Sequence, residues 1–290
     1  MDRFRSLIKL CRPEQYYKNL VVFLAIFFSG HMIFADELLL AAIGFISLSL
    51  MSSTNYIIND IFDRKRDIYN KEKARPLIKG EISVISAAAV SILLFILSLV
   101  MAYFLNTNFL LAVISFFTIS FLYSSLLKNE PFLDIIIISI NFVIRAIAGA
   151  LLIEVWISPW LIIGTFFLAF FLVTGKRKAE MVFLGKKAVK HKPVLAFYSD
   201  KLLDTLVQIS TTTLLISYSL YVFLGVNKML LLTLPIALYI VLRYISFIYG
   251  NSEKARTPNK ALTDMRMAIA IIIYLALSFI LLYYPRFTLS

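Results

Sequence analysis

Nine apolar segments divide this chain, and each is close to the length that crosses a bilayer as a helix. A transmembrane helix needs about 20 mostly apolar residues. Hydrophobic residues make up 60% of the 290 residues and charged residues only 16%, so little of the chain is left for a soluble domain. We therefore predict an all-α polytopic membrane protein with a single membrane-embedded domain over residues 1–290. The nine predicted transmembrane segments are 19–35, 38–58, 83–104, 108–127, 132–153, 157–175, 205–226, 229–249 and 266–284.

The basic residues gather in alternate connections, which predicts the orientation of the chain. Five precede the first segment, seven lie between Arg64 and Lys79, and eight lie between Lys176 and Lys201. Because positively charged connections stay in the cytoplasm, we expect the N-terminus inside and the C-terminus outside. Orientation explains the net charge of +12 better than nucleic-acid binding does, so no nucleic acid is expected as a partner. The single cysteine, Cys11, excludes an internal disulfide.

Four polar residues follow the second segment at helical spacing: Asn59, Asp60, Asp63 and Asp67. If the helix continues, successive residues rotate by about 100°, so the four side chains fall within an arc of about 100°. Carboxylates gathered on one face suit Mg²⁺, which takes oxygen ligands and bridges to substrate phosphates. The alternative is an ordinary charged cytoplasmic loop. The ordered spacing favours a metal–diphosphate site.

Arg145 lies in the middle of the fifth segment, in the run NFVIRAIAG, one helical turn after Asn141. A cation deep in a transmembrane span is costly and indicates a functional residue by default. The alternative is a buried arginine that bonds a neighbouring helix for assembly.

The connection after the sixth segment carries further charged candidates. Glu180 lies four residues after Lys176 and three after Arg177, a spacing that fits ordinary helical ion pairs or a phosphate clamp. Asp200 and Asp204 repeat the DxxxD spacing. We favour acidic residues at a helix N-terminus over a second metal-binding pair.

These motifs resemble the UbiA superfamily of intramembrane prenyltransferases, whose signature NDxxDxxxD is similar to NDIFDRKRD at 59–67. Five further stretches resemble the decaprenyl-phosphate phosphoribosyltransferase branch: RPEQYYKNLVVFLAIFFSG (12–30), KARPLIKGEIS (73–83), LYSSLLKNEPFLD (122–134), FVIRAIAGA (142–150) and GKRKAE (175–180). The resemblance implies a UbiA-like bundle of nine helices around a central cavity that opens to the cytoplasmic face. One departure matters: prenyltransferases of the superfamily carry a second aspartate-rich motif where this chain has GKRKAE.

The branch implies transfer of 5-phosphoribose from 5-phosphoribosyl 1-diphosphate (PRPP) to a polyprenyl phosphate, with release of diphosphate, in a prokaryotic cytoplasmic membrane. Asn59, Asp63 and Asp67 would then hold Mg²⁺ and act as catalytic residues, and Asp60 would complete the metal-binding group from outside the direct ligands. The residues expected to hold the substrates are Lys18, Arg75, Arg145, Lys176, Arg177 and Glu180.

Two other functions remain open. One is transfer of a prenyl group from a prenyl diphosphate to an aromatic or other small acceptor. The other is a transporter, which would place ionisable groups near the bilayer midplane; here most charges gather at one face. A homo-oligomer is an open possibility for either kind of protein.

Overall fold

A computed structural model describes residues 3–67, 75–185, 188, 192–225, 227–250 and 252–287, without the side chains of 3–4, 65–67 and 285–287. Every element in these ranges is a helix. They form two compact units, residues 1–137 with 141–156 (unit 1) and residues 138–140 with 157–290 (unit 2). A single transferase domain over 1–290 remains a prediction.

Eight helices in the described part of the chain are long and apolar enough to cross a membrane. They correspond to the second to ninth predicted segments. They are α3 (Ala35–Asp67), α4 (Val84–Leu105), α5 (Thr107–Ser125), α6 (Leu133–Leu152), α7 (Pro159–Leu184), α9 (Asp200–Leu224), α10 (Leu234–Tyr249, preceded by the 3-10 helix η5, Lys228–Thr233) and α12 (Met265–Phe287).

The first predicted segment, 19–35, is not one continuous helix. It consists of the end of a 3-10 helix, η1 (Pro13–Val22), then the short helix α2 (Phe23–Phe28) and a turn. Gly30 has a φ of 75°, the backbone N–H of Gly30 donates to Phe27 O, and that of His31 donates to Ile26 O. This is the Schellman arrangement that ends a helix at a glycine. The predicted count of nine spanning helices therefore remains a prediction.

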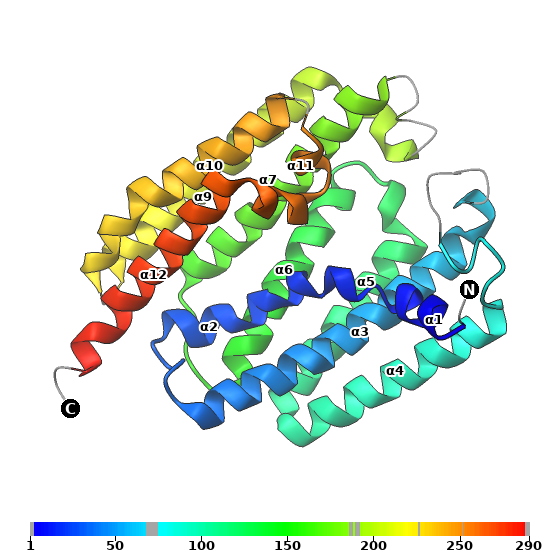
Figure 1. Ribbon diagram of the computed structural model, residues 1–290, viewed down its shortest axis with the longest axis horizontal. Helices are drawn as coiled ribbons and strands as arrows, with labels where there is room; N and C mark the ends of the chain where they lie inside the picture. The colour runs from blue at the N-terminus through cyan, green and yellow to red at the C-terminus, as the bar shows by residue number, and fades with distance from the viewer. Residues whose placement is uncertain are drawn as a thin grey trace. The chain divides into compact units, whose positions relative to one another are not determined.

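Unit 1 is built around the long helix α3. The helices α1 (Arg3–Cys11), η1 and α2 run along α3, and α4 and α5 pack against it (Figure 1). Its core contains Leu48, Phe109 and Leu152, all almost fully buried. A Cβ atom built on Gly149 of α6 would lie 2.0 Å from the carbonyl oxygen of Val22. Only glycine allows α6 and η1 to approach so closely.

Polar caps begin several helices. Ser83, which follows the turn residue Gly80, accepts a hydrogen bond from the backbone N–H of Ser86 at 3.0 Å and caps α4. Asn106 caps α5 in the same way, through the N–H of Phe109 at 2.7 Å.

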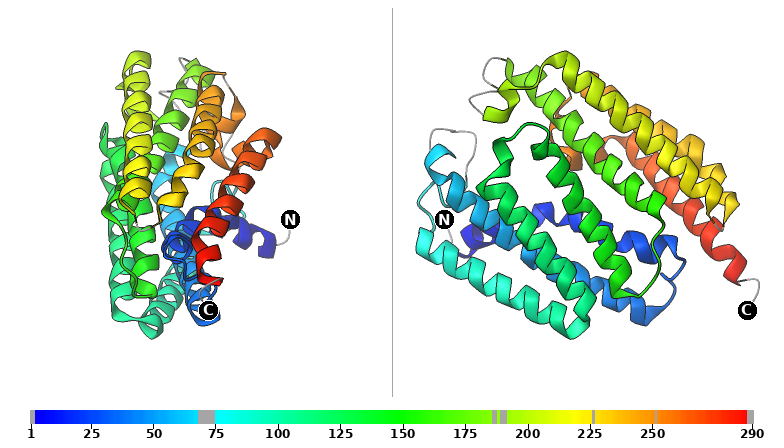
Figure 2. Two further views of the ribbon diagram at one scale, coloured as in Figure 1. Left: turned by 90° about the vertical axis from the view of Figure 1, so that its left-hand side faces the viewer. Right: turned by 180° about the vertical axis from the view of Figure 1, so that it is seen from behind.

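In unit 2, α7 packs along α9, and α10 contacts α7, α9 and α12 (Figure 2). Phe171, Val207 and Ile248 belong to its buried core. Three short helices complete it: η4 (Pro193–Ala196), α11 (Glu253–Arg256) and η6 (Pro258–Thr263).

Large apolar side chains face outward from the long helices. On α4, Ile92 is 60% exposed and Phe104 is 80% exposed, and Ile272 on α12 is 64% exposed. Contiguous exposed apolar surface of this kind is unfavourable in water and is solvated by lipid. With the eight apolar helices, it identifies an integral membrane protein.

Candidate active site

The helix α3 continues through Asp67 without a break, as the one-face interpretation of Asn59, Asp60, Asp63 and Asp67 requires. The backbone therefore places these four residues along one side of the C-terminal part of α3. The side chain of Asp67 lies outside the described residues, so its predicted role as a ligand remains a prediction.

Asp60 is buried and neutralised by two arginines. Arg75 donates a hydrogen bond to Asp60 Oδ1 at 2.6 Å, and Arg12 forms an ion pair with the same oxygen. Asp60 is only 3% exposed. The pair ties residue 75 and the turn between α1 and η1 to α3. Arg12 has a φ of 54°, an uncommon backbone conformation for a residue other than glycine.

This arrangement changes what two predicted site residues can do. Asp60 is already paired with Arg12 and Arg75, which favours its predicted role outside the direct ligands of the metal. Arg75, predicted to hold a phosphate, contacts Asp60. Arg12 was not among the predicted site residues, although it begins the stretch RPEQYYKNLVVFLAIFFSG that resembles the phosphoribosyltransferase branch.

Asp63 is paired with Lys128, which lies in the short 3-10 helix η2 (Leu127–Asn129). Lys128 Nζ is 2.6 Å from Asp63 Oδ1, and Asp63 is 7% exposed. Lys128 was not among the predicted site residues, although it lies in the stretch LYSSLLKNEPFLD that resembles the phosphoribosyltransferase branch. Its signal was its isolation as the one basic residue in the connection after the fourth segment.

The residues at this end of α3 fit a magnesium ion by their donor chemistry. Asn59 and Asp63, one turn apart on one face, supply an amide oxygen and a carboxylate, which are oxygen donors suited to Mg²⁺. Asp67 follows one further turn along the helix. Among the described side chains, no cluster of three or more His, Cys, Asp or Glu residues is found.

Arg145 is 5% exposed on α6 and bonded to neighbouring groups of unit 1. Its Nε donates to Asn19 Oδ1 at 2.8 Å and its Nη1 to the carbonyl of Asn141 at 3.0 Å. The guanidinium carbon lies 4.3 Å from the centroid of the Phe116 ring. The assembly contact considered for this residue is therefore present.

Asn19 connects Arg145 to α3. It is fully buried in η1, donates to Ser49 Oγ at 3.0 Å and accepts from Ser52 Oγ at 3.2 Å. The level of Arg145 along α3 is thus that of residues 49–52, about two turns before Asn59.

Lys18 adds a second cation beside Arg145. It is partly buried in η1, and its ammonium lies 5.9 Å from the centroid of the Tyr56 ring. Burial, together with the positive charges of Arg145 and Arg12, lowers the pKa of Lys18 to about 8. Within the described ranges, no carboxylate forms an ion pair with Lys18 or Arg145. Their combined positive charge favours an anion at this place.

The predicted residues of the second connection come together in unit 2. Arg177 Nη1 is 3.2 Å from Glu180 Oε2, and Lys176 Nζ is 3.7 Å from Glu180 Oε1. Arg177 is 5% exposed. The helical ion pairing is confirmed, and Glu180 holds the basic pair in place. Phosphate binding by these three residues remains a prediction.

Asp200 and Asp204 hold a lysine that the sequence reasoning did not single out. Lys178 is 4% exposed and lies 2.6 Å from Asp200 Oδ1 and 2.8 Å from Asp204 Oδ1. Asp204 also accepts a hydrogen bond from Tyr249 at 2.9 Å. Asp200 does lie in the first turn of α9, but the N-cap is Ser199. The acidic pair thus joins α7, α9 and α10.

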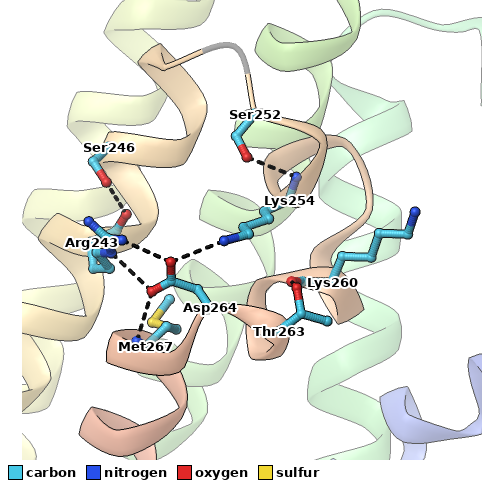
Figure 3. Close-up of polar contacts among 8 residues, drawn as sticks. All are labelled: Arg243, Ser246, Ser252, Lys254, Lys260, Thr263, Asp264 and Met267. Atoms are coloured by element: carbon cyan, nitrogen blue, oxygen red, sulfur yellow. Dashed lines mark hydrogen bonds and ion pairs between the residues drawn. The ribbon is translucent and has the colours of Figure 1, made fainter.

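A further ionic cluster closes the connection before α12 (Figure 3). Arg243 donates to Asp264 at 2.8 and 3.2 Å, and Lys254 donates to it at 3.0 Å. Asp264 also accepts from the backbone N–H of Met267 at 3.0 Å. Hydrogen bonds from Arg243 and then Lys254 hold the pKa of Asp264 well below its usual range. Asp264 therefore fixes α11 and η6 between α10 and α12.

Comparison with known proteins assigns the family. Residues 19–272 match the UbiA prenyltransferase family. The chain belongs to this family. It is an enzyme of the UbiA superfamily. The structure of a UbiA homologue from Archaeoglobus fulgidus bound to GPP and Mg²⁺ aligns with a TM-score of 0.75 and 23% identity, covering 96% of this chain and 99% of that one.

Two curated relatives extend the comparison. A decaprenyl-phosphate phosphoribosyltransferase from Mycolicibacterium smegmatis is 31% identical over 223 residues, which cover 75% of this UbiA-family chain and 70% of that protein. A digeranylgeranylglyceryl phosphate synthase from Sulfurisphaera tokodaii is 31% identical over 133 residues, which cover 44% of this chain and 46% of that protein.

Proposed function

We propose that this UbiA-family enzyme transfers 5-phosphoribose from PRPP to a polyprenyl phosphate and releases diphosphate, with Mg²⁺ as its cofactor. The observation that carries the proposal is the pair of cations Lys18 and Arg145, with which no described carboxylate forms an ion pair. The name of the Mycolicibacterium relative supports the same substrates.

The number of phosphate groups in the reaction explains why these cations matter. A prenyl transfer to an uncharged acceptor needs one diphosphate site, which the metal motif on α3 would supply. Phosphoribosyl transfer must also hold the 5-phosphate of PRPP and the phosphate of the lipid. Lys18 and Arg145 provide charge for such a group, at a level of α3 about two turns away from Asn59.

The residues at the end of α3 have distinct roles in this proposal. Asn59, Asp63 and Asp67 would hold Mg²⁺, which neutralises the departing diphosphate. Lys128, now paired with Asp63, would turn toward a phosphate oxygen once the metal is bound. Asp60 keeps Arg12 and Arg75 beside the site. The acceptor phosphate is already anionic, so positioning matters more than removal of a proton.

The alternative is prenyl transfer from a prenyl diphosphate to an aromatic or other small acceptor. The Sulfurisphaera relative and the GPP-bound Archaeoglobus structure favour it. Against it stand Lys18 and Arg145, which form no ion pair with a described carboxylate, and the basic run Lys176–Lys178 in place of a second aspartate-rich motif.

A labelled-substrate assay separates the two functions. Purified protein with Mg²⁺ and a polyprenyl phosphate is expected to move label from PRPP into an organic-extractable lipid. Label transfer from a prenyl diphosphate to an aromatic acceptor, with none from PRPP, would overturn the proposal. Asp63→Asn is expected to abolish transfer, whereas the same change at exposed Asp36, at the other end of α3, is expected to leave it intact.

The proposal places the N-terminus and the active site on the cytoplasmic side of a prokaryotic membrane, since the basic connections favour that side. A membrane-impermeant label on cysteines introduced singly at Glu81 and at Asn227 tests this. Labelling of Glu81→Cys in intact cells, without labelling of Asn227→Cys, would reverse the assignment.

A further inference from the structure

Asn55 on α3 is a buried carboxamide without a partner. It is 8% exposed, and neither its Oδ1 nor its Nδ2 forms a hydrogen bond. Among the described side chains it is the only amide with both polar atoms buried and unpaired. Leaving such groups unpaired away from water has a free-energy cost. A bound molecule that both donates and accepts hydrogen bonds would remove this cost.

The position of Asn55 indicates which molecule that is. Asn55 lies one turn before Asn59 on α3 and is rotated from it by only about 40°, so the two amides face the same side. On the other side of Asn55 lies Ser52, which is bonded to Asn19 and through Asn19 to Arg145. Tyr56, the residue after Asn55, lies under the ammonium of Lys18. Asn55 is therefore between the proposed metal–diphosphate site and the two cations.

We infer that Asn55 hydrogen-bonds the hydroxyl groups of the donor ribose. The inference rests on the proposed function. In PRPP the diphosphate is on C1 and the monophosphate on C5, and the vicinal hydroxyls of C2 and C3 lie on the ring between them. With the diphosphate at Asn59 and Asp63 and the 5-phosphate at Lys18 and Arg145, the ring hydroxyls face Asn55. A carboxamide donates and accepts, as each hydroxyl does.

The test compares Asn55→Leu, which keeps the volume and removes both polar atoms, with the wild-type protein. KM for PRPP is expected to rise roughly tenfold or more, since the variant loses the hydrogen bonds of both polar atoms to the ribose. KM for the polyprenyl phosphate is expected to stay the same. A donor analogue without the 2-hydroxyl or the 3-hydroxyl should be discriminated against by the wild type and not by Asn55→Leu.

Thermal stability separates ligand binding from a structural role. Because Asn55 is unpaired without ligand, Asn55→Leu is expected to keep or raise the melting temperature of the ligand-free protein and to lose the stabilisation by PRPP. The matched control is Asn106→Leu, which removes a carboxamide bonded to the carbonyls of Leu151 and Leu152 and should lower the melting temperature.

Three results would overturn the inference. The first is a melting temperature that falls in Asn55→Leu as it does in Asn106→Leu, with KM for PRPP unchanged. The second is an altered KM for the lipid phosphate in place of PRPP. The third is a wild-type protein that neither uses PRPP nor is stabilised by it, which removes the proposed function as well. The first two leave the proposed function in place, so the two failures are distinguishable.

Discussion

Gly149→Ala tests whether the close approach of α6 and η1 is as tight as the structure indicates. The new Cβ would lie 2.0 Å from Val22 O, 2.8 Å from Val22 C and 3.2 Å from Val22 Cα. All three are backbone atoms, so no side chain can rotate away. Real Cβ contacts are essentially never closer than 3.0 Å, so η1 or α6 must shift by about 1 Å.

The expected cost follows from the size of this overlap. Overpacking a well-packed interior costs about 1–3 kcal/mol, against a gain of up to about 1 kcal/mol from replacing glycine with alanine in a helix. We expect a net loss of about 1–2 kcal/mol, or a melting temperature lower by roughly 5 °C in detergent. Transfer activity should also fall, because η1 carries Lys18 and Asn19.

Gly164→Ala is the matched control. It makes the same change in the interior of α7, where the nearest atom to the new Cβ is Ser217 Cβ at 3.9 Å, an ordinary contact. Here the helix preference of alanine acts alone, and we expect a gain of about 0.5–1 kcal/mol. Equal melting temperatures for the two variants, or a stabilised Gly149→Ala, would refute the reasoning.

Three other predictions concern charged groups. Lys18, with a pKa of about 8, loses its positive charge as the pH rises through 8. KM for PRPP should therefore rise above that pH in the wild type but not in Lys18→Arg. Identical pH profiles for the two proteins would contradict this. Replacing Asp200 and Asp204 together by Ala should lower the melting temperature, because Lys178 loses both partners, while transfer persists; complete loss of transfer in a folded variant would show a part in catalysis. Asp264→Asn should lower the melting temperature at neutral pH. The difference from wild type should shrink only when the pH falls below the ordinary aspartate range and through the lowered pKa of Asp264, where the carboxylate takes up a proton. A constant difference down to acid pH would argue against the ion pairs.

Features that depend on local spacing could be predicted from the sequence. The continuation of α3 to Asp67 and the pairing of Glu180 with Arg177 follow from helical periodicity. Arg145 could be recognised as a candidate because a charged residue within an apolar run stands out whatever the register of the helix.

Contacts between residues distant in the chain could not be predicted. Lys128 reaches Asp63 across 65 positions, and Lys178 finds Asp200 and Asp204 only when α7 packs on α9. No periodicity within one segment carries such information. The lack of a hydrogen-bond partner at Asn55 could not be predicted for the same reason, because it depends on the positions of all its neighbours.

The 3-10 form of η1 has a consequence for how it fits beside α3. Three residues of a 3-10 helix advance about 6 Å, the same distance as four residues of an α-helix. Tyr16 contacts Ser53 at 2.7 Å and Asn19 contacts Ser49 at 3.0 Å, so three residues of η1 correspond to four residues of α3. The two rises match, so two successive turns of η1 each meet a serine of α3. An α-helical η1 would advance only about 4.5 Å over the same interval and drift out of phase. The 3-10 form of the broken first segment therefore keeps the polar side chains of η1 in register with the serines of α3.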